Sequence, residues 1–243
     1  MSPSLRTALA SPDGKRRYVR TLFSTIADRY DLITRLLSYG QDRHWKRRVV
    51  ALACSERAGD SHRPKGLDLA SGTGDIAFAL ASRGVDVVGL DITHRMLVLA
   101  AAKRRDVAFI TADMTALPFP ARIFDIVTTG YGLRNVPDIE TALAEIARVL
   151  RPGGVFVSLD FNRPSNIVVR GVYLTYLTVV GSTLGLLLHR DPDTYRYIPE
   201  SIRRYPGALA VNGMIRAAGF SSSEYIPVLG GLMAIHRATK NDE

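Results

Sequence analysis

The sequence predicts an α/β protein built on a doubly wound, mostly parallel sheet, and three observations support this fold class. From residue 66 onward, short apolar runs alternate with segments of helical periodicity, which is the pattern of successive βαβ units. A glycine-rich turn at residues 72–74 follows the first apolar run. The last two apolar runs are separated by a tight turn at Gly230 and Gly231, so the strands they form must be antiparallel.

Before the sheet, the chain is expected to form a flexible basic tail and a helical cap. Residues 1–17 are polar and basic, and we expect them to be frayed. The cap, residues 18–53, contains one long helix and a second helix over residues 43–53, followed by a charged linker at 56–65. The long helix is predicted from apolar residues that recur every three or four positions: Val19, Leu22, Phe23, Ile26, Tyr30, Ile33 and Leu37.

The core is predicted over residues 66–161, with helices between its strands. The clearest helix precedes the last strand, because Asp138 caps its start and an Arg-Pro-Gly-Gly sequence ends it. Residues 207–243 add a closing helix and the antiparallel pair. The predicted strands are 66–70, 85–90, 107–111, 124–129, 154–160, 220–227 and 232–238.

Residues 162–206 form an insertion between the fifth predicted strand and the closing helix that the sheet itself does not require. Within it, residues 171–188 contain no charge, a length at which a membrane span must be considered. Hydroxyl residues and three glycines dilute this stretch, and its apolar residues form a helical stripe, so we expect a helical lid or an interfacial helix and not a span. Plain core packing is the alternative. The stripe consists of Tyr173, Leu177, Val180, Leu184 and Leu188.

The composition is that of a folded protein, with 47% hydrophobic and 23% charged residues among 243. The single cysteine, Cys54, excludes an internal disulfide and a cysteine-cluster metal site, and no signal peptide is visible. We therefore expect a cytoplasmic protein without a disulfide or a cysteine-cluster metal site. Residues 1–65 hold 14 Lys and Arg against 6 Asp and Glu, whereas residues 66–243 hold 18 against 17. Such a basic region is compatible with a nucleic acid, an anionic membrane surface, an acidic substrate or a merely solvated surface.

The glycine turn at residues 72–74 is the part of the sequence that indicates which ligand is bound. Gly72 and Gly74 allow the backbone to pass close to a ligand, and Asp91 follows at the distance of a ribose-binding acid, which also matches a dinucleotide fingerprint. However, Asp68 and Asp75 bracket the turn, and no Lys or Arg occurs over residues 66–82. These acids repel a pyrophosphate and attract a cation such as S-adenosylmethionine (SAM), which carries an ammonium and a sulfonium.

The order of these groups resembles the class I, Rossmann-like SAM-dependent methyltransferases. The resemblance implies that Asp91 holds the ribose and Asp113 the adenine amino group. It also implies that Met114 contacts the adenine ring through its backbone and that Thr73 contacts the methionine end. The cofactor-binding set then comprises Asp68, Gly72, Thr73, Gly74, Asp91, Asp113, Met114 and Gly130, and residues 18–243 form a single methyltransferase domain.

Three further segments resemble the ubiquinone/menaquinone-biosynthesis C-methyltransferases. They lie at residues 23–45, at 131–154 and at 193–202, and the likeness extends over about residues 18–238. The chain departs from the family pattern at Ser71, at Gly130 and at residues 160–162. The resemblance implies transfer of a methyl group to a ring carbon of a polyprenylated quinol.

By this resemblance, catalysis needs charge stabilisation and a proton acceptor but no metal. Arg134 stabilises negative charge on the ring, and Asn135 orients the hydroxyl group. His44, Tyr197 and Glu200 are the candidate proton acceptors. The expected partners are the lipophilic quinol and an anionic membrane surface at the inner face of the cell membrane. The sequence does not decide between a monomer and a homodimer.

The alternative hypotheses either keep the methyltransferase fold with another acceptor or assign the protein to another functional class. The same fold also serves another lipophilic acceptor, such as a phospholipid amine or a sterol. An NAD-dependent oxidoreductase is disfavoured by the acids around the glycine turn. An RNA-binding protein is disfavoured because the basic segments lack interleaved aromatic residues. We therefore expect no nucleic-acid partner.

Overall fold

The computed structural model describes residues 5–38, 40–55 and 63–241, and in this part of the chain seven strands form one sheet in the order β3-β2-β1-β4-β5-β7-β6. The first five strands are parallel, and β7 is antiparallel to both β5 and β6. The predicted fold class and the closing antiparallel pair are confirmed. The strands are β1 (Lys65–Leu69), β2 (Asp86–Asp91), β3 (Ala108–Thr111), β4 (Phe124–Gly130), β5 (Leu150–Phe161), β6 (Phe220–Val228) and β7 (Met233–Lys240).

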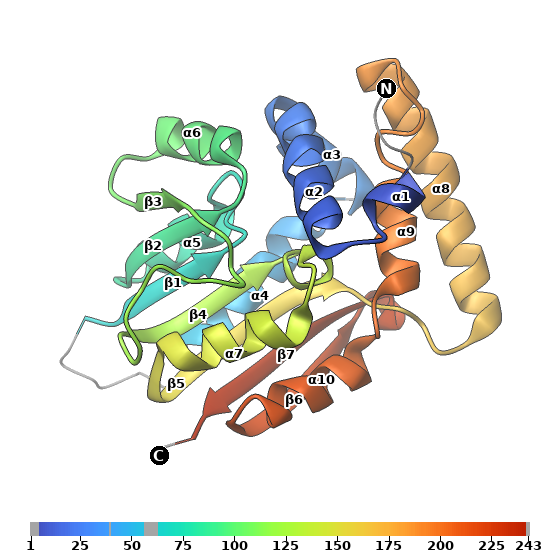
Figure 1. Cartoon of the computed structure of the whole chain (residues 1–243). Helices are drawn as coiled ribbons and strands as arrows, with labels where there is room; N and C mark the ends of the chain where they lie inside the picture. Colours follow the sequence, from blue (N-terminus) through green and yellow to red (C-terminus); the bar gives the residue numbers. More distant parts are fainter. Residues whose placement is uncertain (1–4, 39, 56–62, 242–243) are drawn as a thin grey trace.

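Helices cover both faces of the sheet (Figure 1). One face packs against α4 and α5, and the other packs against α7 and α10, so the central strands are buried on both sides. Because both faces are covered, β1 and β4 are buried along nearly their whole length and do not alternate between buried and exposed residues. These helices and the one beside β2 and β3 are α4 (Asp42–Cys54), α5 (Asp75–Ala81), α6 (His94–Lys103), α7 (Ile139–Val149) and α10 (Ala208–Ala217).

The N-terminal segment is more ordered than expected. Residues 5–17 are largely helical, in α1 (Leu5–Ala8) and the first part of α2 (Pro12–Ile26), so the prediction of a frayed tail is wrong there. Ser11 caps α2 by accepting a hydrogen bond from the Gly14 N–H at 3.1 Å, and Pro12 occupies the first helical position, where its missing N–H costs nothing. Residues 1–4 lie outside the described residues.

The predicted long helix is divided. A 3₁₀ turn, η1 (Ala27–Arg29), separates α2 from α3 (Tyr30–Leu37). The bend lets Ile26 and Ile33 pack into one cluster with Tyr195 from a distant segment. Of the predicted linker at 56–65, residues 56–62 lie outside the described residues, and Lys65 already belongs to β1.

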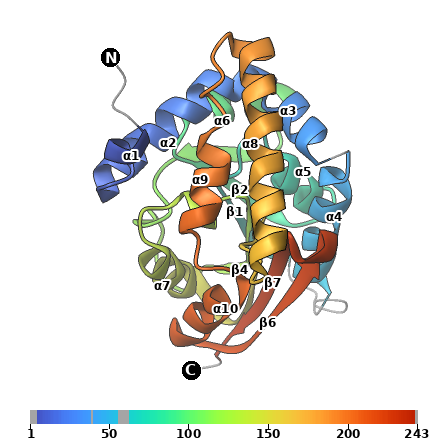
Figure 2. The same cartoon turned by 90° about the vertical axis from the view of Figure 1, so that its right-hand side faces the viewer.

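The insertion consists of two helices, α8 (Ile167–His189) and α9 (Tyr197–Arg204), which lie side by side in Figure 2. Tyr173 and Leu177 of the predicted stripe are buried, whereas Val180, Leu184 and Leu188 are half-buried. In the described part of the chain, α8 is the one helix long and apolar enough to cross a membrane, with a mean hydropathy of 1.6 and 28% of its most apolar window buried. Two 3₁₀ turns, η2 (Leu133–Asn135) and η3 (Leu229–Gly231), follow β4 and β6.

Candidate active site

The carboxyl ends of β1, β2 and β4 meet at a small pocket of about 70 Å³. Asp91, at the end of β2, accepts hydrogen bonds from the Gly72 N–H at 2.9 Å and from the Thr93 N–H at 2.8 Å. Gly72 has a φ of +55°, which glycine adopts without strain and which turns its N–H toward the carboxylate. Asp91 thus lies in the pocket wall with its orientation held by backbone donors of the glycine turn.

Asp68 is buried within β1 and has one oxygen without a partner among the described residues. Its Oδ1 accepts a hydrogen bond from the Thr128 hydroxyl at 2.8 Å, whereas Oδ2 is buried and unpaired. Burial raises the pKa of Asp68 to about 7, although the Thr128 hydrogen bond opposes this rise. Asp68 lines a cleft next to the glycine turn together with Thr73 and Gly130. An unsatisfied buried carboxylate oxygen is costly, and a cationic ligand would relieve that cost.

Asp75, in contrast, is already paired. Lys46 of α4 reaches its Oδ2 at 2.9 Å and the Asp42 Oδ2 at 2.7 Å, so one cation is shared by two carboxylates. The expected attraction of a cationic ligand by Asp75 is therefore reduced by a basic partner from outside residues 66–82. Only the folding of α4 against α5 brings Lys46 there, and sequence spacing does not show this contact.

The other predicted cofactor residues lie around the same pocket. Asp113 and Met114 follow β3 and line the pocket with Gly130. Arg16 of α2 donates from Nε to Asp113 Oδ2 at 2.6 Å. Burial by itself raises the pKa of Asp113, but hydrogen bonds from Thr115 and the Arg16 guanidinium hold it below its usual value. The adenine-binding carboxylate implied by the resemblance is thus occupied by a side chain of this protein.

Thr73 and Gly74 have other partners than expected. The Thr73 hydroxyl donates to Asp31 of α3 at 2.6 Å, and Lys103 binds the same carboxylate at 2.6 Å. Gly74 precedes α5 with a φ of +91°, which favours glycine, and a Cβ there would lie 2.6 Å from the Phe78 ring. A side chain at this position would therefore strain the turn and require the Phe78 ring to shift.

A second cavity, of about 570 Å³, lies between the N-terminal helices and the α8–α9 pair. Its wall is overwhelmingly apolar and aromatic. Tyr30 and Tyr131 line both this cavity and the cofactor-side pocket, so the two spaces adjoin. The wall includes Leu22, Phe23, Ile26, Ile33, Leu37, Trp45, Phe161, Val168, Val169, Val172, Tyr173, Leu177, Tyr195, Ile198, Leu229 and Leu232.

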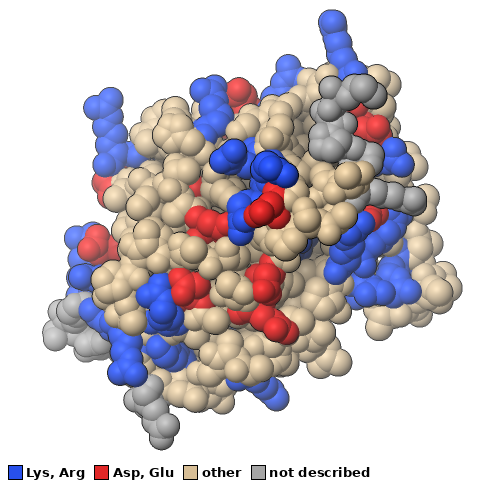
Figure 3. Space-filling view, viewed as in Figure 1, with Lys and Arg blue, Asp and Glu red and all other residues tan. Residues whose placement is uncertain are grey.

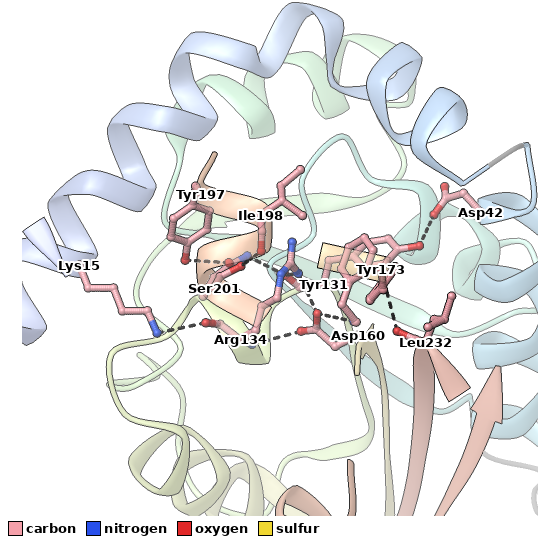
Figure 4. A network of polar contacts seen from close by, with 12 residues as sticks. Lys15, Asp42, Tyr131, Arg134, Asp160, Tyr173, Tyr197, Ile198, Ser201 and Leu232 are labelled. Carbon is pink, nitrogen blue, oxygen red and sulfur yellow. Dashed lines mark hydrogen bonds and ion pairs between the residues drawn. The ribbon is translucent and has the colours of Figure 1, made fainter. Parts of the chain in front are cut away.

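Arg134 lines this apolar cavity from η2, and its side chain is buried (Figure 4). Its Nη1 donates to Asp160 Oδ1 at 2.7 Å and to the Tyr131 carbonyl oxygen at 3.0 Å. The guanidinium carbon lies 4.8 Å from the centre of the Phe161 ring, and Nε has no partner among the described residues. Arg134 is thus a buried cation that is paired with one carboxylate and still has an unused donor.

Asn135 and Tyr197 form a hydrogen-bonded pair beside Arg134. The Tyr197 hydroxyl donates to Asn135 Oδ1 at 3.0 Å, and Asn135 Nδ2 donates to the Tyr131 carbonyl oxygen at 2.7 Å. Burial raises the pKa of Tyr197 far above its usual value, although the Arg134 guanidinium opposes this rise. Tyr197 is therefore protonated at neutral pH, and its hydroxyl acts as a donor and not as a base.

The structure does not bring His44 or Glu200 to either cavity. His44 is exposed on α4, whose inward side carries Trp45, Lys46 and Val49, so the rotation of the helix turns His44 to solvent. Glu200 on α9 accepts from Arg204 Nε at 2.9 Å. The prediction that His44 or Glu200 accepts the proton is therefore wrong, because the packing of each helix turns its side chain away from the cavities.

Sequence reasoning missed Tyr30, Tyr131 and Asp160 as site residues. The Tyr131 hydroxyl donates to Asp42 Oδ1 at 2.7 Å, and its backbone has a φ of +62°, which is unusual for a residue with a side chain. Its position directly after β4 was the available signal, because ligands of parallel sheets bind at the carboxyl ends of strands. Asp160 lies near the carboxyl end of β5 and gave the same signal, but its pairing with Arg134 depends on the packing of a separate loop.

Comparison with known proteins agrees with this architecture. The sequence model of the ubiE/COQ5 methyltransferase family matches residues 12–240. A demethylmenaquinone methyltransferase of Thermus thermophilus is 46% identical over 222 residues, which cover 88% of this chain and 98% of that protein. The ubiquinone/menaquinone biosynthesis C-methyltransferase UbiE of Serratia proteamaculans is 40% identical over 238 residues, which cover 94% of this chain and 92% of that protein.

The fold is shared with more distant enzymes. A solved SAM-dependent methyltransferase from Thermotoga maritima superposes with a TM-score of 0.65 at 17% identity, covering 92% of this chain and 100% of that one. This likeness concerns the fold alone, whereas the family match and the two relatives concern nearly the whole sequence. The chain belongs to the ubiE/COQ5 methyltransferase family.

Proposed function

We propose that this enzyme transfers a methyl group from SAM to a ring carbon of a polyprenylated quinol, either a demethylmenaquinol or a benzoquinol precursor of ubiquinone. The observation that carries the proposal is the apolar cavity of about 570 Å³ that adjoins the cofactor-side pocket through Tyr30 and Tyr131. Such a volume accommodates a small-molecule acceptor, and its apolar wall suits a ring with a hydrocarbon tail. Two close relatives carry names that describe this reaction on quinones.

The residues around the glycine turn fit SAM. The unpaired Asp68 Oδ2 is a partner for an ammonium group, and the Asp91 carboxylate lies where ribose hydroxyls would bind. Met114 and Gly130 line the remaining wall of the pocket, where an adenine ring would lie. When bound, SAM supplies the electrophilic methyl group of its sulfonium. The chain itself supplies position and electrostatics.

Arg134 is the residue placed to stabilise charge on the acceptor. A ring carbon becomes nucleophilic when a neighbouring hydroxyl loses its proton or shares it. The Arg134 guanidinium lines the acceptor cavity; its Nε–H is unpaired but buried, so a quinolate oxygen would reach this donor after a shift of the side chain. Because the site is buried, this donor stabilises a negative oxygen more strongly than it would in water. Asp160 holds the guanidinium in place from the other side.

Tyr197 and Asn135 position the acceptor and do not remove its proton. Tyr197 stays protonated, and its hydroxyl fixes the side-chain carbonyl of Asn135. Asn135 lines the cofactor-side pocket and belongs to the same 3₁₀ turn, η2, as Arg134. With His44 and Glu200 outside the cavities, we propose that the quinol proton leaves to water once Arg134 has lowered the pKa of the hydroxyl.

The enzyme is proposed to act on the cytoplasmic side of the cell membrane, where a quinol with a long tail is held in the lipid. The test of the proposed function is methyl transfer from labelled SAM to demethylmenaquinol, to a demethylated benzoquinol and to phosphatidylethanolamine, assayed side by side. Label in at least one quinol is the expected result. Label in the phospholipid alone would overturn the acceptor, and stabilisation by NAD but not by S-adenosylhomocysteine would overturn the cofactor.

A further inference from the structure

The outer face of α8 is apolar and exposed. The outer face is defined here by Ile167, Val168, Val172, Val179, Leu186 and Leu187, which are between 56% and 73% exposed. A core helix of equal hydropathy would have most of its surface covered, whereas only 28% of the most apolar window of α8 is buried. Contiguous exposed apolar surface of this kind marks an interaction site.

The inner face of α8 is packed too closely for the helix to leave the protein. Gly181 and Gly185 face the segment that connects α8 to α9, and a Cβ on Gly185 would lie 2.5 Å from the Asp191 carbonyl oxygen. Tyr173 and Leu177 are buried on the same side. The helix is therefore built to lie along a surface with one face on the protein, and not to span a bilayer.

Arginines lie at both ends of the outer face. Arg163 and Arg170 lie at the first end of α8 and Arg190 at the second, and no Asp or Glu occurs from residue 161 to residue 190. Beyond that end, the exposed Asp191 follows Arg190 directly, and Asp193 is paired with Arg196 at 3.0 Å. Figure 3 shows Lys and Arg side chains gathered on the side of the molecule where α8 and α9 lie. An apolar face with cations at its ends complements an anionic lipid surface.

The acceptor cavity opens at the same place. Among the residues that line it, Val168, Val169, Val172 and Leu229 are themselves exposed, so they form its mouth. Val168 and Val172 also belong to the outer face. A molecule that reaches the outer face through an apolar medium would therefore meet the mouth without crossing water.

We propose that the outer face of α8 lies on an anionic lipid bilayer, with the helix in the plane of the interface and the cavity mouth turned toward the acyl chains. A second copy of this chain is a poorer occupant. Because both ends of α8 carry arginines, parallel and antiparallel pairing would each place cations against cations. Admission of a lipid acceptor through this mouth rests on the proposed function, but binding of the face to lipid does not.

The test measures binding of the full chain to vesicles of phosphatidylcholine containing roughly a quarter phosphatidylglycerol, by co-flotation. The variant is Val179→Gln/Leu186→Gln/Leu187→Gln, which changes exposed residues that do not line the cavity. We expect it to lower the partition coefficient at least about tenfold. The matched control, Val98→Gln/Leu209→Gln, changes exposed apolar residues on α6 and α10 and should change it less than about twofold.

Further measurements separate the outcomes. Arg163→Gln/Arg190→Gln should weaken binding to the anionic vesicles about fivefold or more, and pure phosphatidylcholine vesicles should bind the wild type more weakly. The proposal is overturned if the wild type does not float with anionic vesicles, or if the α8 variant and the control lose binding equally. It is also overturned if light scattering shows that the wild type is a dimer that does not bind vesicles, and that the α8 variant is a monomer. Failure of quinol methylation with intact vesicle binding would contradict the proposed function alone.

Discussion

Arg16 Nε of α2 lies 2.6 Å from Asp113 Oδ2 at the end of β3, and this ion pair closes the pocket at the glycine turn. The neighbouring Lys15 donates from Nζ to the Arg134 carbonyl oxygen at 3.0 Å and to the Val136 carbonyl oxygen. The pocket beneath α2 measures about 70 Å³, well below the few hundred Å³ of typical ligand sites. We therefore expect that cofactor entry is accompanied by a movement of α2 or by release of Asp113 from the Arg16 side chain.

Removing Arg16 should make cofactor binding tighter. If adenine takes the Asp113 carboxylate, the Arg16–Asp113 pair competes with it, and a partly exposed ion pair contributes about 0.2–1 kcal/mol. Arg16→Gln is expected to lower the dissociation constant of S-adenosylhomocysteine by up to about fivefold, measured by titration calorimetry. Arg17→Gln, an exposed neighbour on the same helix, is the control and should have no effect. Weaker binding by Arg16→Gln would show that Arg16 contacts the cofactor itself.

Removing the Asp91 carboxylate should disrupt both the pocket and the turn. Asp91 accepts the Gly72 and Thr93 N–H groups, and hydrogen bonds to a charged group contribute about 1.5–3 kcal/mol each. Asp91→Ala is expected to weaken S-adenosylhomocysteine binding by more than about tenfold. Asp106→Ala, which changes an exposed acid, serves as the control. Equal affinity in Asp91→Ala and the wild type would refute the ribose assignment.

The Tyr197 hydroxyl and Asn135 should act as one unit in turnover. Because the hydroxyl donates to Asn135 Oδ1 at 3.0 Å, either substitution removes the same contact. In a cycle of Asn135→Ala, Tyr197→Phe and the double variant, we expect a coupling free energy of about 0.5–3 kcal/mol in kcat/KM. Tyr195→Phe removes a hydroxyl bonded instead to His189 and should show no coupling with Asn135→Ala. Additive effects of the two site variants would contradict a shared role.

Arg134 should be needed for stability as well as for turnover. Its guanidinium and the Asp160 carboxylate are both buried, and removal of one partner leaves an uncompensated charge. Arg134→Ala is expected to lower the free energy of unfolding by about 3–5 kcal/mol, measured with urea. Arg134→Lys keeps the charge opposite Asp160 and should fold, with a lower kcat. A fully stable Arg134→Ala protein would mean that the pair is open to water in solution.

The contribution of Asp68 to the stability of the ligand-free protein should fall as pH rises from about 4 to 7, against the opposite contribution of carboxyls such as Asp31 and Asp113, whose pKa values are lowered. Burial raises the pKa of Asp68 from 3.8 to about 7, so within this window the folded state binds more protons than the unfolded state. The difference of about 3 pH units corresponds to about 4 kcal/mol at 1.36 kcal/mol per unit. Asp68→Asn should therefore be more stable than the wild type at pH 8 by up to about 4 kcal/mol, with little difference at pH 4. If the free energy of unfolding by urea changed with pH equally in the wild type and in Asp68→Asn, the assignment of a buried, unpaired Asp68 oxygen would be contradicted.

The alternation of apolar runs and helical segments was sufficient to predict the strands to within a few residues, the parallel core and the closing antiparallel pair. These features depend on local periodicity and turn chemistry, which neighbouring residues carry. Likewise, Asp68, Asp91 and Asp113 could be placed at one edge of the sheet because parallel strands end there together. The order of residues 5–17 was missed because the local start signal at Ser11 and Pro12 was outweighed by the polar composition.

The pairing of charges was decided by tertiary structure. Lys46 meets Asp75 across 29 positions, Arg134 meets Asp160 across 26, and Arg16 meets Asp113 across 97. Such contacts depend on how separate helices pack, and a list of residue types contains no information on that packing. The same holds for His44 and Glu200: the helix of His44 was predicted and that of Glu200 was not, and the direction in which each side chain faces depends on how its helix packs. The fold and the strand ends at which a ligand binds follow from local patterns and could be predicted from the amino acids alone. Which carboxylates stay unpaired and where the apolar cavity opens depend on how α2, α4, α8 and α9 pack, because that packing joins residues far apart along the chain.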